Sequence, residues 1–364
     1  MEARGKELDT HLLEFLRDHL GERELAFAEA PTLIPGGSNV RVHGFRLSAG
    51  PEEFRRPLVL RVWRVPDGSN AASYESCIQN ALVELGYPSP KVLLCCEDPV
   101  ALGAPFQVME RAGGRPLFAA GNNASESDGA SLLVEILPNL GQILLRNWPK
   151  ELARLLAHLH ELDAGFVARR LESRGFDLGR HGLAAHVDRL EKTIEAYDLS
   201  GLRPGIEWLR AHAPPDGARL AVCHGDLFPN QVFVERGRDT VLDWGETLLA
   251  PAEIDVGIVH CGLRTVPVPL PWPVRGIGIA IQRRFAQRFL AAYRALRAVD
   301  ADTMRFGGVL RAVQTLVGVS VRRLALAGAI AEEPRPNPYD HPLGVQLLRE
   351  YLESTASVEV GLPS

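Results

Sequence analysis

The chain has 364 residues, of which 46% are hydrophobic and 23% are charged, and its formal net charge is −5. This composition excludes a disordered chain, a coiled coil and a collagen-like polymer. The length predicts two or three domains or one two-lobed body. The net negative charge argues against a nucleic-acid partner and against an anionic membrane surface.

The five cysteines lie mostly among apolar neighbours and include no Cys-x-x-Cys pair. This pattern favours buried, reduced thiols over a disulfide framework or a zinc site. The first twenty residues mix charged and apolar side chains at helical spacing, unlike a signal peptide, and no run of 18 apolar residues occurs. We therefore expect a soluble, cytoplasmic protein without a membrane partner.

Short apolar runs broken by glycine-containing turns extend over residues 25–64. Val, Leu and Phe at alternate positions predict antiparallel strands in this stretch. Residues 70–86 have the apolar spacing of a helix, and residues 91–96 and 105–109 predict two further strands. The first lobe should therefore be a small antiparallel sheet that carries one helix.

The chain beyond residue 116 is predicted to be mainly helical, apart from one small β region over residues 219–244. The strongest helical patterns cover residues 149–163, 183–197, 202–213, 275–298, 302–330 and 343–355. We expect an α+β fold with two domains. An N-terminal β lobe would span residues 1–111, and a larger, mainly helical lobe would span residues 112–364.

The most informative segment is a predicted β-hairpin that follows a polar loop. Strands over residues 232–235 and 240–243 should flank a four-residue turn that contains a glycine. If this hairpin closes symmetrically, position 232 pairs with position 243, and the loop holding Asn230 and Gln231 comes close to Asp243.

A second carboxylate, Asp226, precedes this loop. Carboxylate and carboxamide oxygens suit a hard cation such as Mg²⁺, which also binds phosphate oxygens. In phosphoryl transfer, one carboxylate orients the attacking hydroxyl and accepts its proton, and the other holds the metal. The segment therefore indicates phosphoryl transfer.

The segment HGDLFPNQ, followed by Asp243 and Trp244 at a spacing of 17 residues after Asp226, carries a family resemblance. It resembles the catalytic loop and metal-binding segment of the aminoglycoside phosphotransferase and choline kinase-like family, which has a protein kinase-like fold. The resemblance extends from Gly36 to Asp255. It implies a kinase that uses Mg²⁺ and either ATP or GTP to phosphorylate a hydroxyl of a small-molecule acceptor.

The resemblance implies roles for four residues around the catalytic loop. Asp226 would be the catalytic base, and His224 would brace its loop. Asp243 would be the principal metal ligand. Asp255 would tie the catalytic loop to the following helix.

The resemblance also implies nucleotide contacts in the first lobe. Arg61 would face the nucleotide phosphates, and Glu75 would pair with it from the helix. A glycine turn would lie over the phosphates, where backbone N–H groups can approach an anion. The turn consists of Gly36, Gly37, Ser38 and Asn39. The hinge that would bind adenine begins at Val108 and includes Met109, Glu110, Arg111 and Ala112.

Two positions depart from the family pattern. Gln231 stands where the family usually has asparagine, and Asn230 comes one residue earlier. Glutamine retains the carbonyl oxygen, so either residue could bind the metal, and we favour Gln231. Arg61 replaces the more usual lysine and would bind phosphate as a planar fork.

The acceptor and one alternative function stay open at this stage. The acceptor could be aminoglycoside-like, a macrolide or a metabolic alcohol. The chain could also be a nucleotide-binding pseudokinase that acts as a sensor or scaffold, although the intact pair Asp226 and Asp243 argues against this. A metal-dependent hydrolase built on His224 and Asp226 would need further ligands at metal spacing, which the sequence does not show.

Overall fold

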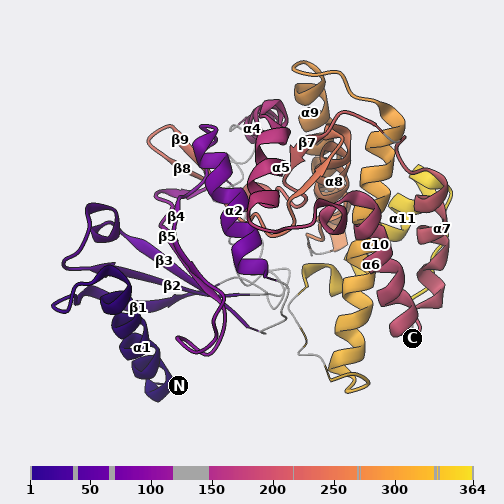
Figure 1. Ribbon diagram of the computed structural model, residues 1–364. Helices are drawn as coiled ribbons and strands as arrows, with labels where there is room; N and C mark the ends of the chain where they lie inside the picture. Colours follow the sequence, from indigo (N-terminus) through magenta and orange to yellow (C-terminus); the bar gives the residue numbers. More distant parts are fainter. Residues whose placement is uncertain are drawn as a thin grey trace. The chain divides into compact units, whose positions relative to one another are not determined.

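The computed structural model describes residues 2–35, 40–64, 70–117, 147–215, 217–268, 270, 272–331, 334 and 337–362. It divides into two compact units (Figure 1). The first unit contains Met1–Arg115 and Phe233–Gly245, and the second contains Pro116–Val232 and Glu246–Ser364. Residues 233–245, which contain most of the hairpin, thus belong to the first unit. The predicted division has a single boundary, after residue 111.

The first unit is built on an antiparallel sheet with the strand order β1-β2-β3-β5-β4. A second, three-stranded sheet with the order β6-β8-β9 contains the hairpin. The elements are α1 (Glu2–Leu20), β1 (Phe27–Ile34), β2 (Val40–Leu47), η1 (Glu52–Arg55), β3 (Leu58–Trp63), α2 (Ala71–Glu84), β4 (Val92–Cys96), β5 (Phe106–Glu110), β6 (Arg115–Pro116), β8 (Val232–Glu235) and β9 (Arg238–Val241).

Alternation along β3 explains how this sheet positions Arg61. Successive side chains of a strand point to opposite faces. Leu58 and Leu60 belong to the apolar core that also contains Leu12 and Leu16 of α1. Arg61 belongs to the other set of β3 side chains and forms an ion pair with α2.

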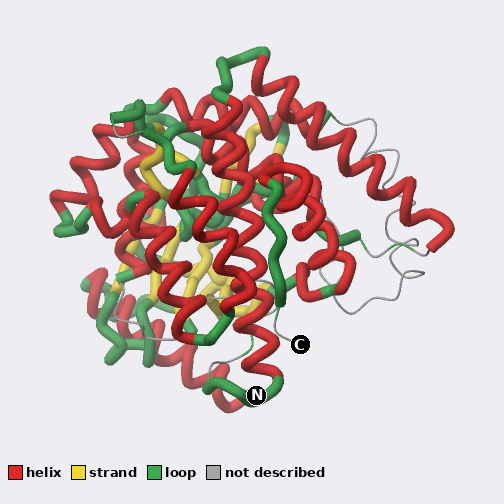
Figure 2. The backbone as a smooth tube through the Cα atoms, turned by 90° about the vertical axis from the view of Figure 1, so that its right-hand side faces the viewer, coloured by secondary structure: helices red, strands yellow, loops and turns green. Residues whose placement is uncertain are grey.

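The second unit is mainly helical, and Figure 2 shows helices over most of the face that it presents. Its short strands β7 and β10 pair antiparallel. The elements are α4 (Trp148–Glu161), α5 (Ala164–Ser173), α6 (Leu183–Ala196), α7 (Arg203–Ala211), β7 (Ala221–Cys223), η4 (Pro229–Gln231), β10 (Leu248–Ala250), α8 (Ala252–Thr265), α9 (Trp272–Arg294), α10 (Ala301–Leu326) and α11 (Pro342–Ala356).

Helices α8 and α10 approach each other closely in the core of the second unit. A Cβ atom on Gly257 would collide with the Met304 carbonyl, and one on Gly307 would collide with the Ile254 carbonyl. Glycine is therefore needed at both crossing points. The close crossing holds the next turn of α10, which carries Arg311, near the catalytic loop.

The predicted strands of the first lobe and the six predicted helices are confirmed, with ends shifted by a few residues. Helices α5 and α8 lay outside the predicted set. The predicted hairpin turn is wrong, because β9 begins at Arg238 rather than at residue 240. No helix in the described ranges is long and apolar enough to cross a bilayer.

Candidate active site

The sequence His224-Gly225-Asp226, which the family resemblance assigns to a catalytic loop, directly follows β7 in the second unit. Gly225 has φ of +80°. A Cβ atom there would collide with the Glu246 carbonyl. The turn that presents Asp226 therefore requires glycine both for its backbone angle and for the space around it.

Asp255 of α8 holds this loop through hydrogen bonds to its backbone. Its buried carboxylate accepts hydrogen bonds from the backbone N–H of His224 at 2.6 Å and of Gly225 at 3.0 Å. The ring of His224 is also buried, and its Nδ1 accepts from the backbone N–H of Asp226 at 3.3 Å. Both side chains thus hydrogen-bond to the backbone of the loop that they are predicted to brace.

A buried network continues behind Asp255. His160 of α4 lies with Nε2 3.2 Å from the Asp255 carboxylate and with Nδ1 2.7 Å from the Tyr293 hydroxyl. Cys223 lies beside this pair, so the three groups are close enough for a metal site. Burial raises the pKa of the Cys223 thiol well above its usual range. A protonated thiol and a histidine with both nitrogens engaged indicate a hydrogen-bonded core network instead.

The Asp226 side chain is held on both oxygens. Arg311 Nη2 of α10 lies 2.7 Å from Oδ1, and Gln231 Nε2 donates to Oδ2 at 3.4 Å. The Asp226 side chain keeps 26% of its surface exposed, whereas that of Arg311 keeps 13%. The carboxylate is therefore fixed in orientation and still accessible.

Arg311 is a site residue that sequence reasoning missed. Burial opposes its charge, yet the nearby carboxylate of Asp226 raises its pKa, so the guanidinium stays charged. Its guanidinium also lies over the ring of Phe228, 5.6 Å from the centroid. The available signal was a single arginine within the apolar part of a long predicted helix.

The two candidate metal ligands of the loop differ in their contacts. The Gln231 carbonyl oxygen accepts from the backbone N–H of Phe228 at 2.8 Å, so this side chain closes its own turn. The Asn230 side chain is exposed and makes no hydrogen bond to the described residues. The carboxamide oxygen of Asn230 is thus the more available one for a cation.

In the first unit, Arg61 forms the predicted ion pair with Glu75. The Arg61 side chain is 11% exposed and that of Glu75 is 4% exposed. Arg61 Nη2 also lies 3.9 Å from the carboxylate of Asp243, which is 55% exposed. Burial opposes the charge of Arg61, but the two carboxylates raise its pKa.

Asp243 follows β9 in a left-handed backbone conformation, with φ of +71°. The hairpin turn consists of Arg236 and Gly237, which both have positive φ, as in a two-residue type I′ turn. Such a turn aligns residue 235 with 238 and residue 232 with 241, so the predicted pairing of 232 with Asp243 is wrong. A carboxylate held in a strained, exposed position beside a cation suits binding of a charged ligand.

The remaining predicted nucleotide residues are only partly described. Gly36, Gly37, Ser38 and Asn39 lie outside the described residues. Met109 and Glu110 end β5, and Arg111 and Ala112 follow it. The backbone N–H groups of Glu110 and Arg111 donate to the carbonyls of Lys91 at 3.0 Å and Pro57 at 3.1 Å. Any adenine contact by these two residues would therefore use other backbone groups.

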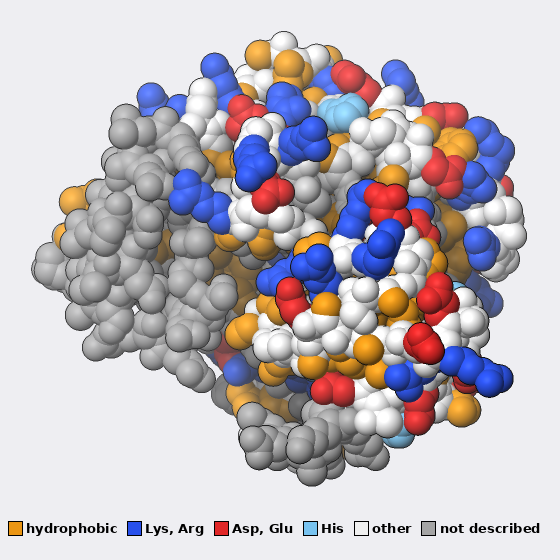
Figure 3. Space-filling view, turned by 90° about the vertical axis from the view of Figure 1, so that its left-hand side faces the viewer, with side chains coloured by type: hydrophobic (Ala, Val, Ile, Leu, Met, Phe, Trp, Pro, Cys, Tyr) orange, Lys and Arg blue, Asp and Glu red, His pale blue; other side chains and the backbone are white. Residues whose placement is uncertain are grey.

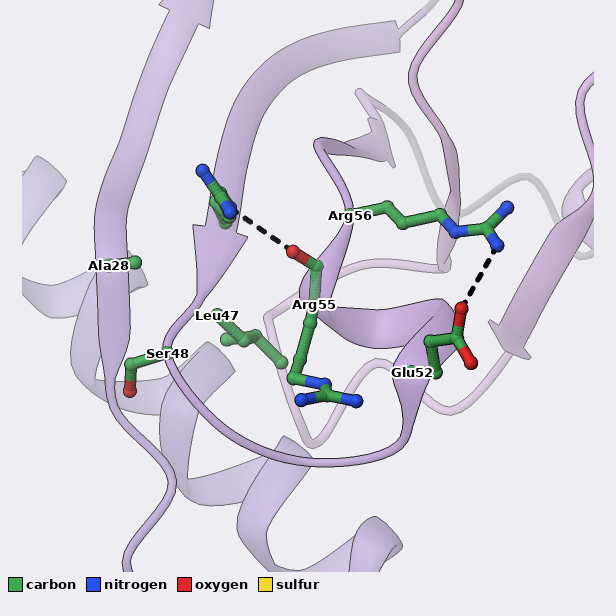
Figure 4. Close-up of a pocket in the computed structure, with 7 residues that line it drawn as sticks. Ala28, Leu47, Ser48, Glu52, Arg55 and Arg56 are labelled. Atoms are coloured by element: carbon green, nitrogen blue, oxygen red, sulfur yellow. Dashed lines mark hydrogen bonds and ion pairs between the residues drawn. The ribbon is translucent and has the colours of Figure 1, made fainter.

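Figure 4 shows a pocket of about 520 Å³ in the first unit. Its charged lining residues are Arg46, Arg55, Arg56 and Glu52, and none of the predicted site residues lines it. Arg46 donates to the Arg55 carbonyl at 3.1 Å, and Arg56 donates to Glu52 at 3.4 Å. Basic and acidic side chains are also interspersed over the face in Figure 3.

Comparison with known proteins gives relatives of two kinds. Acyl-CoA dehydrogenase family member 11 of Pongo abelii is 27% identical over 283 residues, which cover 72% of this chain and 32% of that protein. Aminoglycoside 3'-phosphotransferase of Streptomyces fradiae is 28% identical over 206 residues, which cover 53% of this chain and 71% of that protein. The chain therefore spans about a third of the length of the first relative.

Among solved structures, the chain resembles a thermostable mutant of aminoglycoside phosphotransferase APH(4)-Ia in a ternary complex with ADP and hygromycin B. The TM-score is 0.54 at 15% identity, and the match covers 95% of this chain and 99% of that chain. This likeness establishes the protein kinase-like α+β fold. A family profile described as the phosphotransferase enzyme family matches residues 32–306, more than half of the sequence. The chain belongs to this phosphotransferase family.

Proposed function

We propose that the protein is a kinase that transfers the γ-phosphate of ATP to a hydroxyl of a small molecule. The observation that carries this proposal is Asp226, an accessible carboxylate whose two oxygens are held by Arg311 and Gln231 on a loop braced by Asp255. A base for phosphoryl transfer must be held within hydrogen-bond reach of the acceptor hydroxyl, and this arrangement restricts the side chain in that way.

In the proposed reaction, the acceptor oxygen forms a bond to the γ-phosphorus, and the bond from that phosphorus to the bridging oxygen of ADP breaks. Asp226 accepts the hydroxyl proton as the new bond forms, and ADP leaves. Because the transition state is loose, orientation of the hydroxyl by Asp226 contributes more than the strength of the base.

We assign nucleotide and metal contacts to the other predicted residues. Asp243 of the first unit and Asn230 of the second are assigned as metal ligands because each offers an oxygen of the hard type that Mg²⁺ prefers, whereas Gln231 closes its own loop. Bound Mg²⁺ would neutralise charge that develops on the phosphate oxygens. Arg61 would bind nucleotide phosphate, and Glu75 would hold its guanidinium in place. The turn of residues 36–39 would lie over the phosphates, and residues 109–112 would contact adenine.

Two observations refine the donor and the compartment. The APH(4)-Ia complex contains ADP, which supports ATP rather than GTP as the donor. All five cysteines are free thiols. Because ATP and reduced thiols are both typical of the cytoplasm, we place the activity there.

The test is transfer of label from γ-labelled ATP, with Mg²⁺, to a panel of aminoglycosides, macrolides, amino-acid alcohols, hydroxy acids and simple diols. Asp226→Ala is the control, since it removes the base and leaves the first unit unchanged. We expect a labelled phosphomonoester with the wild-type protein only. Nucleotide binding without transfer to any acceptor would instead indicate the pseudokinase alternative.

A further inference from the structure

Arg311 introduces a positive charge beside the base of the second unit. Its Nη2 lies 2.7 Å from Asp226, and its buried Nε has no hydrogen-bond partner among the described residues. A guanidinium has five N–H donors in a planar fork, so one carboxylate oxygen does not saturate it. Because the Arg311 side chain is 13% exposed, donors that Asp226 does not use can face an additional acceptor group.

Two titratable side chains near Arg311, Tyr339 and Cys261, do not compensate its charge. Burial raises the pKa of Tyr339 to about 12, although the charge of Arg311 opposes this shift. Burial likewise raises the pKa of Cys261 to about 12. Both groups are therefore neutral at physiological pH, and Phe228 covers the guanidinium with an uncharged ring.

The described part of the second unit offers few carboxylates to a cationic acceptor near Asp226. Besides Asp226, the carboxylate whose charge acts on Arg311 is Glu246, and this group accepts a hydrogen bond from Gln314 at 3.3 Å. Asp255 is buried and engaged by the catalytic loop. An ammonium group next to the reacting hydroxyl would meet the positive charge of Arg311, and like charges at close range are strongly unfavourable.

We propose that Arg311 selects the acceptor, which is a hydroxyl compound that carries a carboxylate or another acidic group rather than an ammonium group. The acidic group accepts hydrogen bonds from the exposed part of the guanidinium while Asp226 orients the hydroxyl. This inference rests on the proposed function and narrows its acceptor class. Polycationic aminoglycosides are then poor acceptors for this protein.

The experiment compares acceptors that share a carbon skeleton and differ only in the second group. One such set is 4-hydroxybutyrate, 1,4-butanediol and 4-amino-1-butanol, and equivalent sets with three to six carbons vary the reach. A charge-assisted hydrogen bond between the acid and Arg311 is more favourable than the contact of an ammonium group with Arg311. This difference in binding free energy is large enough to change affinity at least ~10-fold. We therefore expect each acid to exceed its matching amine at least ~10-fold in kcat/KM.

Two variants and a control locate the selection at one residue. Arg311→Gln should raise KM for the acid by about 10- to 100-fold and reduce its advantage over the diol, whereas Arg311→Lys should retain part of that advantage. Arg305→Gln, on the same helix in an exposed ion pair with Asp302, should leave both KM values unchanged. Thermal melting of each variant separates loss of selection from loss of folding.

Binding to the protein loaded with Mg²⁺ and a non-hydrolysable ATP analogue provides a second measurement that needs no turnover. Calorimetry should detect carboxylate binding in the wild-type protein and its loss in Arg311→Gln. Absence of any carboxylate binding that depends on Arg311, or preference for the amine over its matching acid, would overturn the inference. Phosphorylation of the hydroxyl of the amino alcohols would leave the proposed function intact. If no acceptor in the panel were phosphorylated, the proposed function itself would be contradicted.

Discussion

Each unit of the protein pairs a buried arginine with an aspartate of the candidate site, but the two pairs differ in how charge is compensated. In the first unit, Glu75 neutralises Arg61, and Asp243 remains half exposed at 3.9 Å. In the second unit, Arg311 contacts Asp226 itself at 2.7 Å. Asp243 therefore keeps a half-exposed carboxylate, whereas Asp226 is fixed in orientation and its charge is offset.

The largest expected effect separates the roles of these two aspartates. Asp226→Asn should lower phosphate transfer by about 10²- to 10⁴-fold, because it removes the proposed proton acceptor, and should preserve binding of Mg²⁺·ATP. Asp243→Asn should weaken binding of Mg²⁺·ATP as well as transfer, since it removes the proposed metal ligand. Titration calorimetry with an ATP analogue and initial-rate assays measure the two properties. Equal loss of nucleotide binding in both variants would remove the distinction between the units.

The next effect tests whether Glu75 neutralises the charge of Arg61. Glu75→Gln should destabilise the protein by about 3 kcal/mol, because it leaves a buried guanidinium without its main carboxylate partner. Urea unfolding measures this free energy. The matched control is Glu52→Gln, whose partner Arg56 is 61% exposed, and it should change stability by less than about 0.5 kcal/mol. A loss as small as that of the control would show that Asp243 alone compensates Arg61.

A third effect concerns the buried histidine of α8 in the second unit. Burial, assisted by Arg264 and Arg294, lowers the pKa of His260 to about 4. His260 binds a proton near pH 6.5 in the unfolded chain but only near pH 4 in the folded chain. The contribution of His260 to the free energy of unfolding is therefore complete above pH 6.5 and is lost as the pH falls toward 4. His260 should account for about 3 kcal/mol of this loss. Unfolding curves of His260→Gln should show a correspondingly flatter decline between pH 7 and pH 4, and an unchanged decline would contradict the assignment.

The smallest expected effect concerns the turn after Asp226. Gln231→Ala removes the acceptor for the Phe228 N–H and the donor to Asp226, which should cost about 1 kcal/mol of stability and lower transfer modestly. Asn230→Ala should leave stability unchanged but raise the Mg²⁺ concentration needed for half-maximal transfer. If Gln231→Ala instead raised the Mg²⁺ requirement, the ligand assignment favoured from the sequence would be correct.

Local patterns in the sequence were sufficient to predict strands with alternating apolar residues and helices with one apolar face. The apolar alternation of β3 places Arg61 on the face opposite the core that contains Leu60. The amphipathic helices α4, α6 and α7 were predicted because one face of each is polar. By contrast, α8 is buried almost throughout, so it shows little amphipathic pattern.

Other features depend on contacts that no local pattern encodes. The pairing of Arg311 with Asp226 needs the close crossing of α8 and α10 at Gly257 and Gly307. The hairpin turn was misassigned because Arg236 takes a positive φ, a conformation that sequence patterns reserve for glycine and asparagine. The partner of Arg311 and the hairpin register could therefore be identified only from the folded chain.

The central claim, that this chain moves phosphate from ATP to an acceptor hydroxyl, is tested most directly by phosphorus-31 NMR of a reaction with Mg²⁺, ATP and the acceptor panel. The proposed function predicts a new phosphomonoester resonance that grows in equal amount with ADP and is absent with Asp226→Asn. ATP that is bound but never consumed, or a phosphomonoester formed equally well by the variant, would contradict it.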